Sequence, residues 1–194
     1  MKKLVFLHGG GADKNAYFET MQNIALKFNA ELITFNAPFP HPNKNGKFIW
    51  FNKKEINGRR DAVEEDYFYS LGYIKNQLSK LKNDDDDIIL IGHSQGGGLA
   101  VHVGLEMELG MVISICGDLP YNISYKNDST TPIYWCEGGK DTYIDDNRKK
   151  THYFLKDIKA NYFYQNFSNS THNEFTEDLL NLIENIETSS ETVS

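Results

Sequence analysis

The sequence has little that would favour export or a membrane span. Only two of its 194 residues are cysteines, and no segment approaches the roughly 20 apolar residues of a transmembrane helix. The first apolar run, residues 4–7, is too short for the core of a signal peptide, and no small-residue cleavage site follows it. These absences predict a cytoplasmic protein in which Cys116 and Cys136 are buried thiols rather than one disulfide.

Blocks or stripes of basic residues are also missing. The chain has 27 Asp and Glu residues against 20 Lys and Arg residues, and its formal net charge at pH 7 is −7. Nucleic acids and anionic membrane surfaces attract proteins through clustered lysine and arginine. We therefore expect neither as a partner, and the sequence leaves the oligomeric state open, a homodimer included.

The glycine-rich segments lack the marks of a cofactor site. No glycine loop ends in the Gly-Lys-Ser/Thr of a phosphate-binding P-loop, and no G-x-G-x-x-G opens a helix. His, Cys and Asp residues do not recur at the spacing of zinc ligands. The sequence predicts neither a cofactor nor a metal ion.

Apolar periodicity predicts strands and helices that alternate along the chain. Six short apolar or alternating runs predict strands at residues 4–7, 32–35, 88–91, 112–116, 133–136 and 161–167. Helical spacing predicts helices at residues 13–28, 63–81, 97–109, 145–158 and 175–186. This alternation predicts a doubly wound, mostly parallel sheet of about six strands with helices on both faces. We expect one domain over residues 1–187 without a separate cap, and a disordered tail over residues 188–194.

One long segment, residues 36–58, follows neither the strand nor the helix period. It contains three of the five prolines of the chain and four aromatic residues. Long loops without secondary structure are uncommon in compact domains and are often functional. We expect this segment to form a pocket wall.

The most specific motif follows the predicted strand at residues 88–91. Gly92-His93-Ser94-Gln95-Gly96 fits G-x-S-x-G between a strand and a helix, which is the context that gives this motif its meaning. The serine must adopt a strained backbone angle there, and a β-carbon at Gly92 or Gly96 would clash. Its hydroxyl would lie near helix N-terminal amides, which favour a developing negative charge. We interpret Ser94 as a nucleophile.

A serine nucleophile needs a general base in contact and an acid that orients the base. Of the six histidines, only His172 lies in a turn between a predicted strand and a helix, so we predict that it is the base. His93 is expected to point away from the turn, and His8 is expected to shape a glycine turn. The predicted acid is Asp141, directly after the fifth strand, while Asp118 after the fourth strand remains an alternative.

The oxyanion of a tetrahedral intermediate needs at least two N–H donors. The first predicted donor is the amide of Gln95, directly after the nucleophile. The second is expected in the His-Gly-Gly-Gly turn at residues 8–11, after the first strand, and Gly10 is our prediction.

Taken in order, these motifs resemble the small phospholipase/carboxylesterase group of α/β-hydrolases, which includes the acyl-protein thioesterases. The resemblance runs through most of the chain and implies an α/β-hydrolase fold, with the chain order nucleophile, acid and base. The segments that carry it are Leu7-His8-Gly9 with Gly11 and Asp13, Trp50-Phe51-Asn52, Gly92-His93-Ser94-Gln95-Gly96-Gly97, Gly117-Asp118-Leu119-Pro120, residues 138–141 and Thr171-His172.

This sequence departs from the family pattern at Gly10, Asn52, His93 and Thr142. The departures leave the triad intact, but they weaken the step from an esterase of this family to a thioesterase that acts on lipidated protein.

The motifs and the resemblance together imply a cofactor-independent serine hydrolase that cleaves small-molecule carboxylic esters or thioesters through an acyl-enzyme intermediate. A hydrolase of lactones or peptides is an alternative, because a triad does not choose its leaving group. Another is a catalytically silent fold that binds an acyl ligand or a protein. The side chains expected to contact the acyl chain are Phe39, Trp50, Phe51, Leu119 and Tyr143.

Overall fold

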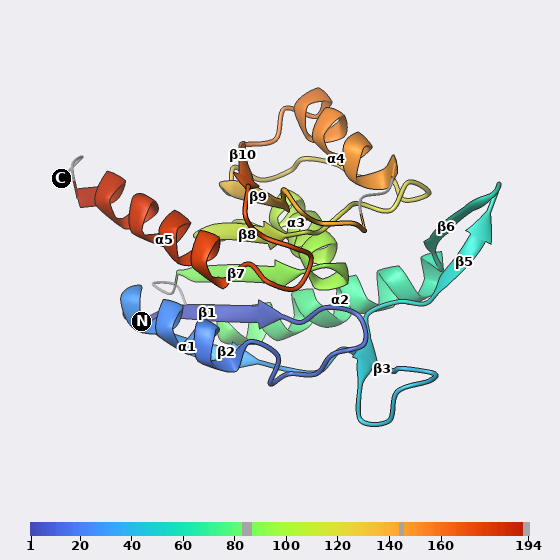
Figure 1. The fold of residues 1–194 in the computed structure, drawn as a ribbon, viewed down its shortest axis with the longest axis horizontal. Helices are drawn as coiled ribbons and strands as arrows, with labels where there is room; N and C mark the ends of the chain where they lie inside the picture. Colours follow the sequence, from blue (N-terminus) through green and yellow to red (C-terminus); the bar gives the residue numbers. More distant parts are fainter. Residues whose placement is uncertain (83–86, 144–145, 192–194) are drawn as a thin grey trace.

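A six-stranded sheet organises the computed structural model, which describes residues 1–82, 87–143 and 146–191. The strand order is β10-β9-β8-β7-β1-β2 (Figure 1), and every pairing in this sheet is parallel. The strands are β1 (Lys2–Leu7), β2 (Ala30–Thr34), β7 (Ile88–His93), β8 (Met111–Ile115), β9 (Ile133–Gly138) and β10 (Tyr162–Phe167). The predicted number of strands and their parallel arrangement are confirmed.

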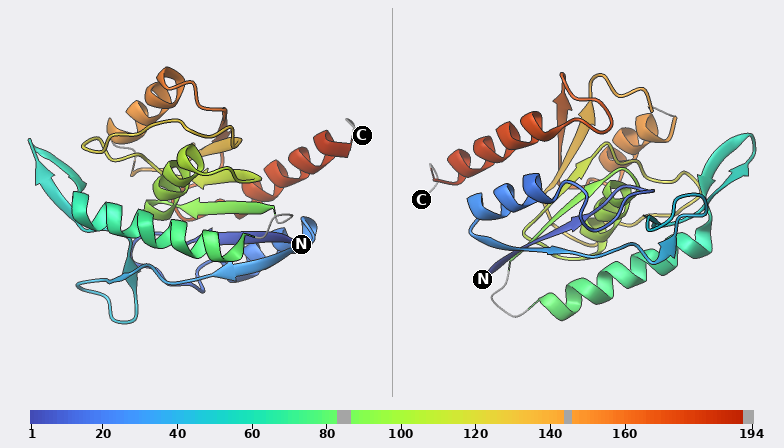
Figure 2. Two further views of the ribbon diagram at one scale, coloured as in Figure 1. Left: turned by 180° about the vertical axis from the view of Figure 1, so that it is seen from behind. Right: turned by 60° about the horizontal axis from the view of Figure 1, so that its bottom comes forward.

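Helices cover both faces of the sheet (Figure 2), so its central strands are apolar on both sides. Along β1, Leu4 and Phe6 belong to one buried cluster, and Val5 and Leu7 to another. The helices packed in the first cluster are α1 (Phe18–Lys27) and α5 (Thr176–Glu191). Those packed in the second are α2 (Glu64–Leu81), α3 (Gln95–Glu106) and α4 (Asp146–Asp157). The doubly wound arrangement is therefore confirmed.

The segment between β2 and α2 is more ordered than the loop that we predicted. It forms two antiparallel ribbons, β3 (Phe39–Pro40) with β4 (Phe48–Ile49), and β5 (Lys53–Ile56) with β6 (Arg59–Ala62). The second ribbon extends away from the body of the molecule (Figures 1 and 2). It turns at Asn57 and Gly58, whose φ angles are 52° and 76°. A two-residue hairpin favours Asn-Gly for this reason, but hydrophobic periodicity cannot detect it because the flanking strands are polar.

The described helix ends differ from prediction at three helices, and α3 spans Gln95–Glu106 rather than residues 97–109. Helix α1 begins at Phe18 rather than near Asp13, because Tyr17 has a φ of 54° and Asp13 instead accepts a hydrogen bond from the Asn15 amide in a tight turn. Helix α5 continues into the predicted tail, where the Thr188 hydroxyl bonds a preceding backbone carbonyl. Residues 192–194 of that tail lie outside the described residues. None of the described helices is long and apolar enough to cross a membrane.

Both cysteines are buried and outside any disulfide in the described chain, as predicted. Cys136 lies on β9 and Cys116 directly follows the neighbouring β8, and the Cys116 amide donates to the Cys136 carbonyl at 2.8 Å. Burial raises the pKa of the Cys136 thiol. Since the thiolate is the reactive form, this side chain contributes to packing rather than to chemistry.

A buried polar group links α2 to α3 inside the core. His102 is 1% exposed, with Nδ1 at 3.0 Å from the Tyr67 hydroxyl and Nε2 at 3.3 Å from the Glu106 carboxylate. A carboxylate can only accept, so Nε2 carries the ring proton and Nδ1 accepts from Tyr67. Burial lowers the pKa of His102 to about 4, although Glu106 favours the charged form. The core therefore contains a neutral imidazole.

Replacing this residue, His102→Gln, should flatten the acid side of the stability profile. The unfolded chain takes up a proton at the ordinary histidine pKa of 6.5, but the folded chain does so only near pH 4. The free energy of unfolding is therefore retained above about pH 6.5 and falls as the pH drops toward 4. At pH 5 the loss attributable to this histidine is about 2 kcal/mol relative to pH 7.5. Urea unfolding of both proteins at the two pH values measures it, and an equal loss in the variant would contradict the prediction.

Candidate active site

Ser94 lies at the sharp turn from β7 into α3, at the carboxyl edge of the sheet. Its φ of 53° is positive, which is a strained conformation for a residue with a side chain. A β-carbon on Gly92 would lie 2.3 Å from the Gly96 carbonyl oxygen, and one on Gly96 would lie 2.5 Å from the Leu7 carbonyl oxygen. The predicted need for both glycines is therefore confirmed.

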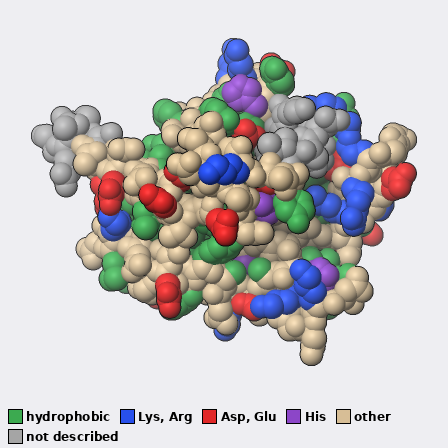
Figure 3. All heavy atoms as spheres, in the orientation of Figure 1, with side chains coloured by type: hydrophobic (Ala, Val, Ile, Leu, Met, Phe, Trp, Pro, Cys, Tyr) green, Lys and Arg blue, Asp and Glu red, His purple; other side chains and the backbone are tan. Residues whose placement is uncertain are grey.

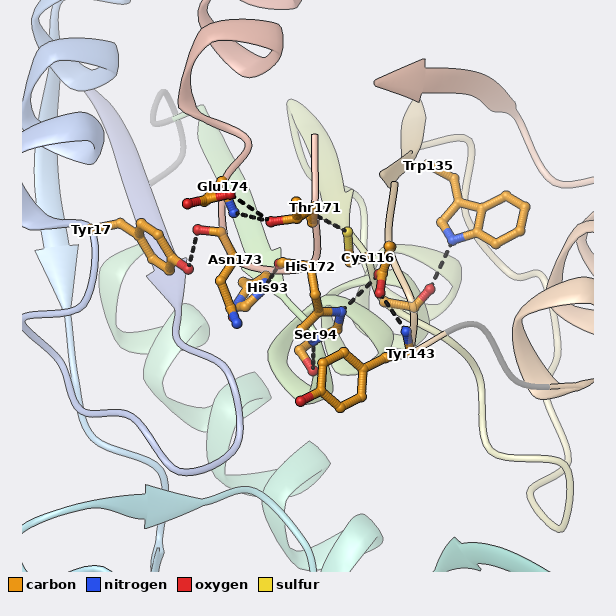
Figure 4. Close-up of polar contacts among 12 residues, drawn as sticks. Tyr17, His93, Ser94, Cys116, Trp135, Tyr143, Thr171, His172, Asn173 and Glu174 are labelled. Carbon is orange, nitrogen blue, oxygen red and sulfur yellow. Dashed lines mark hydrogen bonds and ion pairs between the residues drawn. The ribbon is translucent and has the colours of Figure 1, made fainter. Parts of the chain in front are cut away.

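Ser94 and His172, which are far apart in the sequence, meet beside this turn (Figure 4), and Asp141 joins them through the imidazole. His172 Nε2 lies 3.1 Å from Ser94 Oγ, and His172 Nδ1 lies 2.8 Å from Asp141 Oδ2. The Asp141 side chain is fully buried, and its other carboxylate oxygen accepts the Tyr143 amide at 2.7 Å. Because the carboxylate only accepts, Nδ1 carries the ring proton and the Nε2 lone pair faces the serine hydroxyl.

The alternative acid, Asp118, lies in a different part of the site. It lines a hollow that reaches Ser94 on the side of Phe51 and Pro120. In the described chain, His172 Nδ1 donates its hydrogen bond to Asp141. The geometry therefore favours Asp141 as the partner of the imidazole.

Two side chains for which the sequence indicated no supporting role hold the turn that carries His172. His93 Nε2 donates to the backbone carbonyl of His172 at 2.7 Å, and the two rings lie 5.1 Å apart (Figure 4). The Tyr17 hydroxyl donates to the Asn173 carbonyl at 3.0 Å. His93 thus bonds the backbone carbonyl of His172 rather than the serine hydroxyl. Tyr17 and Asn173 are 156 positions apart, so no local sequence pattern indicates their contact.

The glycine turn after β1 is built on a buried histidine, as expected for His8. Its Nδ1 lies 2.8 Å from the Gly9 carbonyl, and its Nε2 accepts the Ala37 amide at 3.0 Å. Burial lowers the pKa of His8, so the neutral ring satisfies both neighbours. The His8 ring therefore holds the backbone of the turn from its buried side.

Two backbone amides near the serine are available to a ligand. The amide of Gln95 belongs to the first turn of α3, where helix amides have no acceptor four residues earlier. The amide of Gly10 makes no hydrogen bond within the described parts of the chain. Gly10 also lines the same hollow as Ser94 and His172.

Of the five side chains expected in the acyl pocket, two line hollows at the serine. Phe51 lines the hollow on the Asp118 side, and Tyr143 lines the one that includes His172. The Tyr143 ring lies 4.9 Å from the imidazole of His172. These two are the expected contacts that the structure brings to Ser94.

The other three expected contacts lie elsewhere. Trp50 has no exposed surface, and its indole N–H donates to the His8 carbonyl at 2.7 Å. Leu119 lines a separate cavity of about 130 Å³ beside α4, and Phe39 packs on an exposed tyrosine of α2. The aromatic content of residues 36–58 indicated a segment close to Ser94, but it cannot show which of its rings faces the hollow.

Three potential metal ligands also converge at this point. Cys116 Sγ, a carboxylate oxygen of Asp141 and a ring nitrogen of His172 lie within 4.8 Å of one another. The Asp141–His172 separation of 2.8 Å is shorter than the roughly 3.4 Å between two tetrahedral ligands that are each about 2.1 Å from zinc. The pair therefore has the geometry of a hydrogen bond rather than of a shared metal.

Solved structures of other proteins share the fold of this chain. The crystal structure of esterase PE8 has a TM-score of 0.76 at 20% identity, over 96% of this chain and 92% of that one. Acyl-protein thioesterase 2 of Zea mays has a TM-score of 0.75 at 19% identity, over 96% and 93% of the two chains. At these identities the likeness concerns the fold.

The sequence then assigns the family. A family model described as Phospholipase/Carboxylesterase matches residues 1–190, and the chain belongs to that family of ester hydrolases. A stretch of 104 residues is 32% identical to a "Putative monoglyceride lipase" of Schizosaccharomyces pombe (strain 972 / ATCC 24843). That match covers 53% of this chain and 24% of the relative, so the chain spans about a quarter of that protein's length.

Replacing a glycine with alanine should have opposite effects on the free energy of unfolding in the crowded serine turn and on the open surface of α2. Gly96→Ala places a methyl group against the backbone of β1 and should lower the free energy of unfolding by at least about 2 kcal/mol. Gly72→Ala, on α2, meets no atom within 4 Å and should raise it by roughly 0.5–1 kcal/mol, because alanine favours the helix. Urea unfolding measures both, and a Gly96→Ala protein as stable as Gly72→Ala would contradict the packing.

Proposed function

We propose that the protein is a serine hydrolase that cleaves carboxylic esters or thioesters through an acyl-enzyme intermediate. One observation carries the proposal, which is the hydrogen-bonded series from Ser94 Oγ to His172 and on to Asp141, with separations of 3.1 Å and 2.8 Å. This is the arrangement that makes a serine hydroxyl nucleophilic. Membership of an ester-hydrolase family supports the same reaction class.

Acylation begins when Ser94 Oγ attacks the acyl carbon and His172 Nε2 takes the hydroxyl proton. The buried carboxylate of Asp141 holds the ring in this tautomer and stabilises the imidazolium that forms. The tetrahedral intermediate collapses as the carbon–oxygen or carbon–sulfur bond breaks. His172 returns its proton to the leaving alcohol or thiol, and the acyl group remains on Ser94.

Deacylation repeats these steps with water as the nucleophile. His172 Nε2 takes a proton from the attacking water and then protonates Ser94 Oγ as the ester bond to the enzyme breaks. A carboxylic acid leaves and the resting enzyme is restored. No cofactor enters either half of the reaction.

The amides of Gln95 and Gly10 are the donors that we assign to the oxyanion in both intermediates. Neither amide is committed to another acceptor among the described residues, and both lie on turns that adjoin Ser94. Donors positioned before reaction stabilise developing charge without reorganisation. Phe51 and Tyr143 are the side chains that we expect the acyl group to contact.

Ester and thioester substrates both fit this chemistry. Each has an acyl carbon that Ser94 can attack and an alcohol or thiol leaving group that His172 can protonate. The thioesterase from maize is a structural neighbour and the yeast relative is described as a lipase. A rate profile across acyl esters and acyl-thioesters of increasing length separates the two classes.

Loss of the nucleophile should abolish turnover. Ser94→Ala is expected to lower kcat on para-nitrophenyl butyrate by about 10⁶-fold, and it should no longer react with a fluorophosphonate probe. The control variant Ser168→Ala, at an exposed serine of a nearby turn, should be labelled like the wild type. A wild-type protein that resists the probe would identify a silent fold, and a Ser94→Ala protein that keeps substantial activity would identify another nucleophile.

A second pair of variants tests the assignment of the acid. Asp141→Asn should lower kcat by about 10⁴-fold, because the amide cannot hold the ring tautomer that the base needs. Asp118→Asn, which leaves the bond between Asp141 and His172 in place, should cost less than about tenfold. Steady-state kinetics on one ester decides between them, and a larger loss at Asp118 would reverse the assignment.

A further inference from the structure

The hollow that contains Ser94 and His172 has one cationic end. Its lining combines the glycine turn at residues 9–12 with the side chains of Tyr17, His93, Tyr143, Asn173 and Lys44. Lys44 brings a full positive charge to this lining, and no carboxylate is among the described residues that form it. Lys44 is therefore a local cation at this hollow, in a chain whose net charge is −7.

Two nitrogen groups converge over Gly11 at this end. A β-carbon built on Gly11 would lie 3.2 Å from Lys44 Nζ and 3.5 Å from His41 Nε2. His41 Nδ1 accepts the Asn43 amide at 3.1 Å, so in the neutral ring Nε2 carries the proton. An ammonium group and an imidazole N–H donor therefore lie side by side over the turn.

The ribbon formed by β3 and β4 fixes the position of these two groups. The Gly11 amide donates to the Phe48 carbonyl and the Phe48 amide donates to the Ala12 carbonyl, each at 2.8 Å. These bonds attach the ribbon to the glycine turn next to Ser94. Figure 3 shows lysine and histidine side chains gathered on this face, over the β3–β4 ribbon.

The two lysines of the ribbon differ in their partners. Lys47 Nζ lies 2.5 Å from the Asp13 carboxylate, and this contact holds the pKa of the Asp13 carboxyl below its usual range. The nearby acid is thereby neutralised. The Lys44 side chain has no ion pair or hydrogen bond within the described chain, so its charge is available to a ligand.

We infer that the protein prefers substrates that carry an anionic group, a carboxylate or a phosphate, which Lys44 and His41 bind while Ser94 attacks the carbonyl. The inference rests on the proposed function and specifies its substrate class. Both groups line or border the hollow that contains the nucleophile, so one substrate molecule reaches the serine and the cation together. Since Lys44 is exposed, salt should weaken the preference.

The test compares an anionic and a neutral ester that share one leaving group. The ratio of kcat/KM for mono-para-nitrophenyl glutarate to that for para-nitrophenyl pentanoate should fall by roughly 1.5-fold to fivefold in Lys44→Gln, the range expected for an exposed ion pair. It should fall further in Lys44→Glu, where repulsion replaces attraction. In the wild type the ratio should decrease as sodium chloride is added.

A second pair places the charge on the alcohol instead of the acyl group. The ratio for para-acetoxybenzoate to its methyl ester is measured in the same proteins. A fall in Lys44→Gln for either pair supports the inference and identifies the half of the substrate that carries the charge. Unchanged ratios for both pairs would overturn it.

The control variant is Lys54→Gln, which removes the same charge from an exposed position on β5. Its ratios should equal those of the wild type, and a fall as large as that in Lys44→Gln would indicate net charge rather than a local site. Failure of the proposed function would look different, because the wild type would then hydrolyse neither the neutral nor the anionic esters.

Discussion

The contact between the serine turn and the backbone of β1 is the constraint on which the rest of the site depends. The turn approaches the carbonyls of Leu7 and His8 so closely that Gly96 has no room for a side chain. This approach aligns the start of α3 with the end of β1, and so brings the first amides of the helix next to the glycine turn. The strained φ of Ser94 is sustained by this packing, since an isolated chain would relax it.

The histidines show how one residue type takes different roles according to its surroundings. His8 and His102 are buried, burial lowers the pKa of each, and each ring is bonded through both nitrogens. His93 is also buried, and it donates to the backbone that carries the proposed base. His172 has one nitrogen directed at the Ser94 hydroxyl and the other at the fully buried carboxylate of Asp141, whereas the nitrogens of His102 face a tyrosine hydroxyl and the partly exposed carboxylate of Glu106. The partner of each nitrogen, rather than the residue type, separates the structural histidines from the proposed catalytic one.

The ribbons between β2 and α2 distribute charge in a way that the linear sequence does not reveal. Residues 41–47 contain two lysines and a histidine, but only folding determines that one lysine pairs with Asp13 while the other reaches the hollow at Ser94. An acidic chain can therefore present, at one position, a lysine without an acidic partner among the described residues. Local pairing, not net charge, controls what a small charged ligand meets there.

Much of the architecture could be predicted from local pattern. The alternation of apolar runs predicted the six parallel strands, and G-x-S-x-G after a buried strand predicted the turn at Ser94. The turns that hold Asp141 and His172 were identifiable because carboxyl ends of parallel strands meet at one edge of a sheet. The β5–β6 ribbon was not predicted, because its strands are polar and only its Asn-Gly turn indicates a hairpin.

What the sequence by itself determined was therefore the periodic part of the molecule and the residue types at strand ends. Only the tertiary structure decided that Asp141 rather than Asp118 bonds His172, that Trp50 lies in the core, and that Tyr17 supports the turn after His172. The physical reason is that periodicity reports which side of an element is buried. Contacts between side chains remote along the chain depend on the register and packing of whole elements, which no short segment encodes.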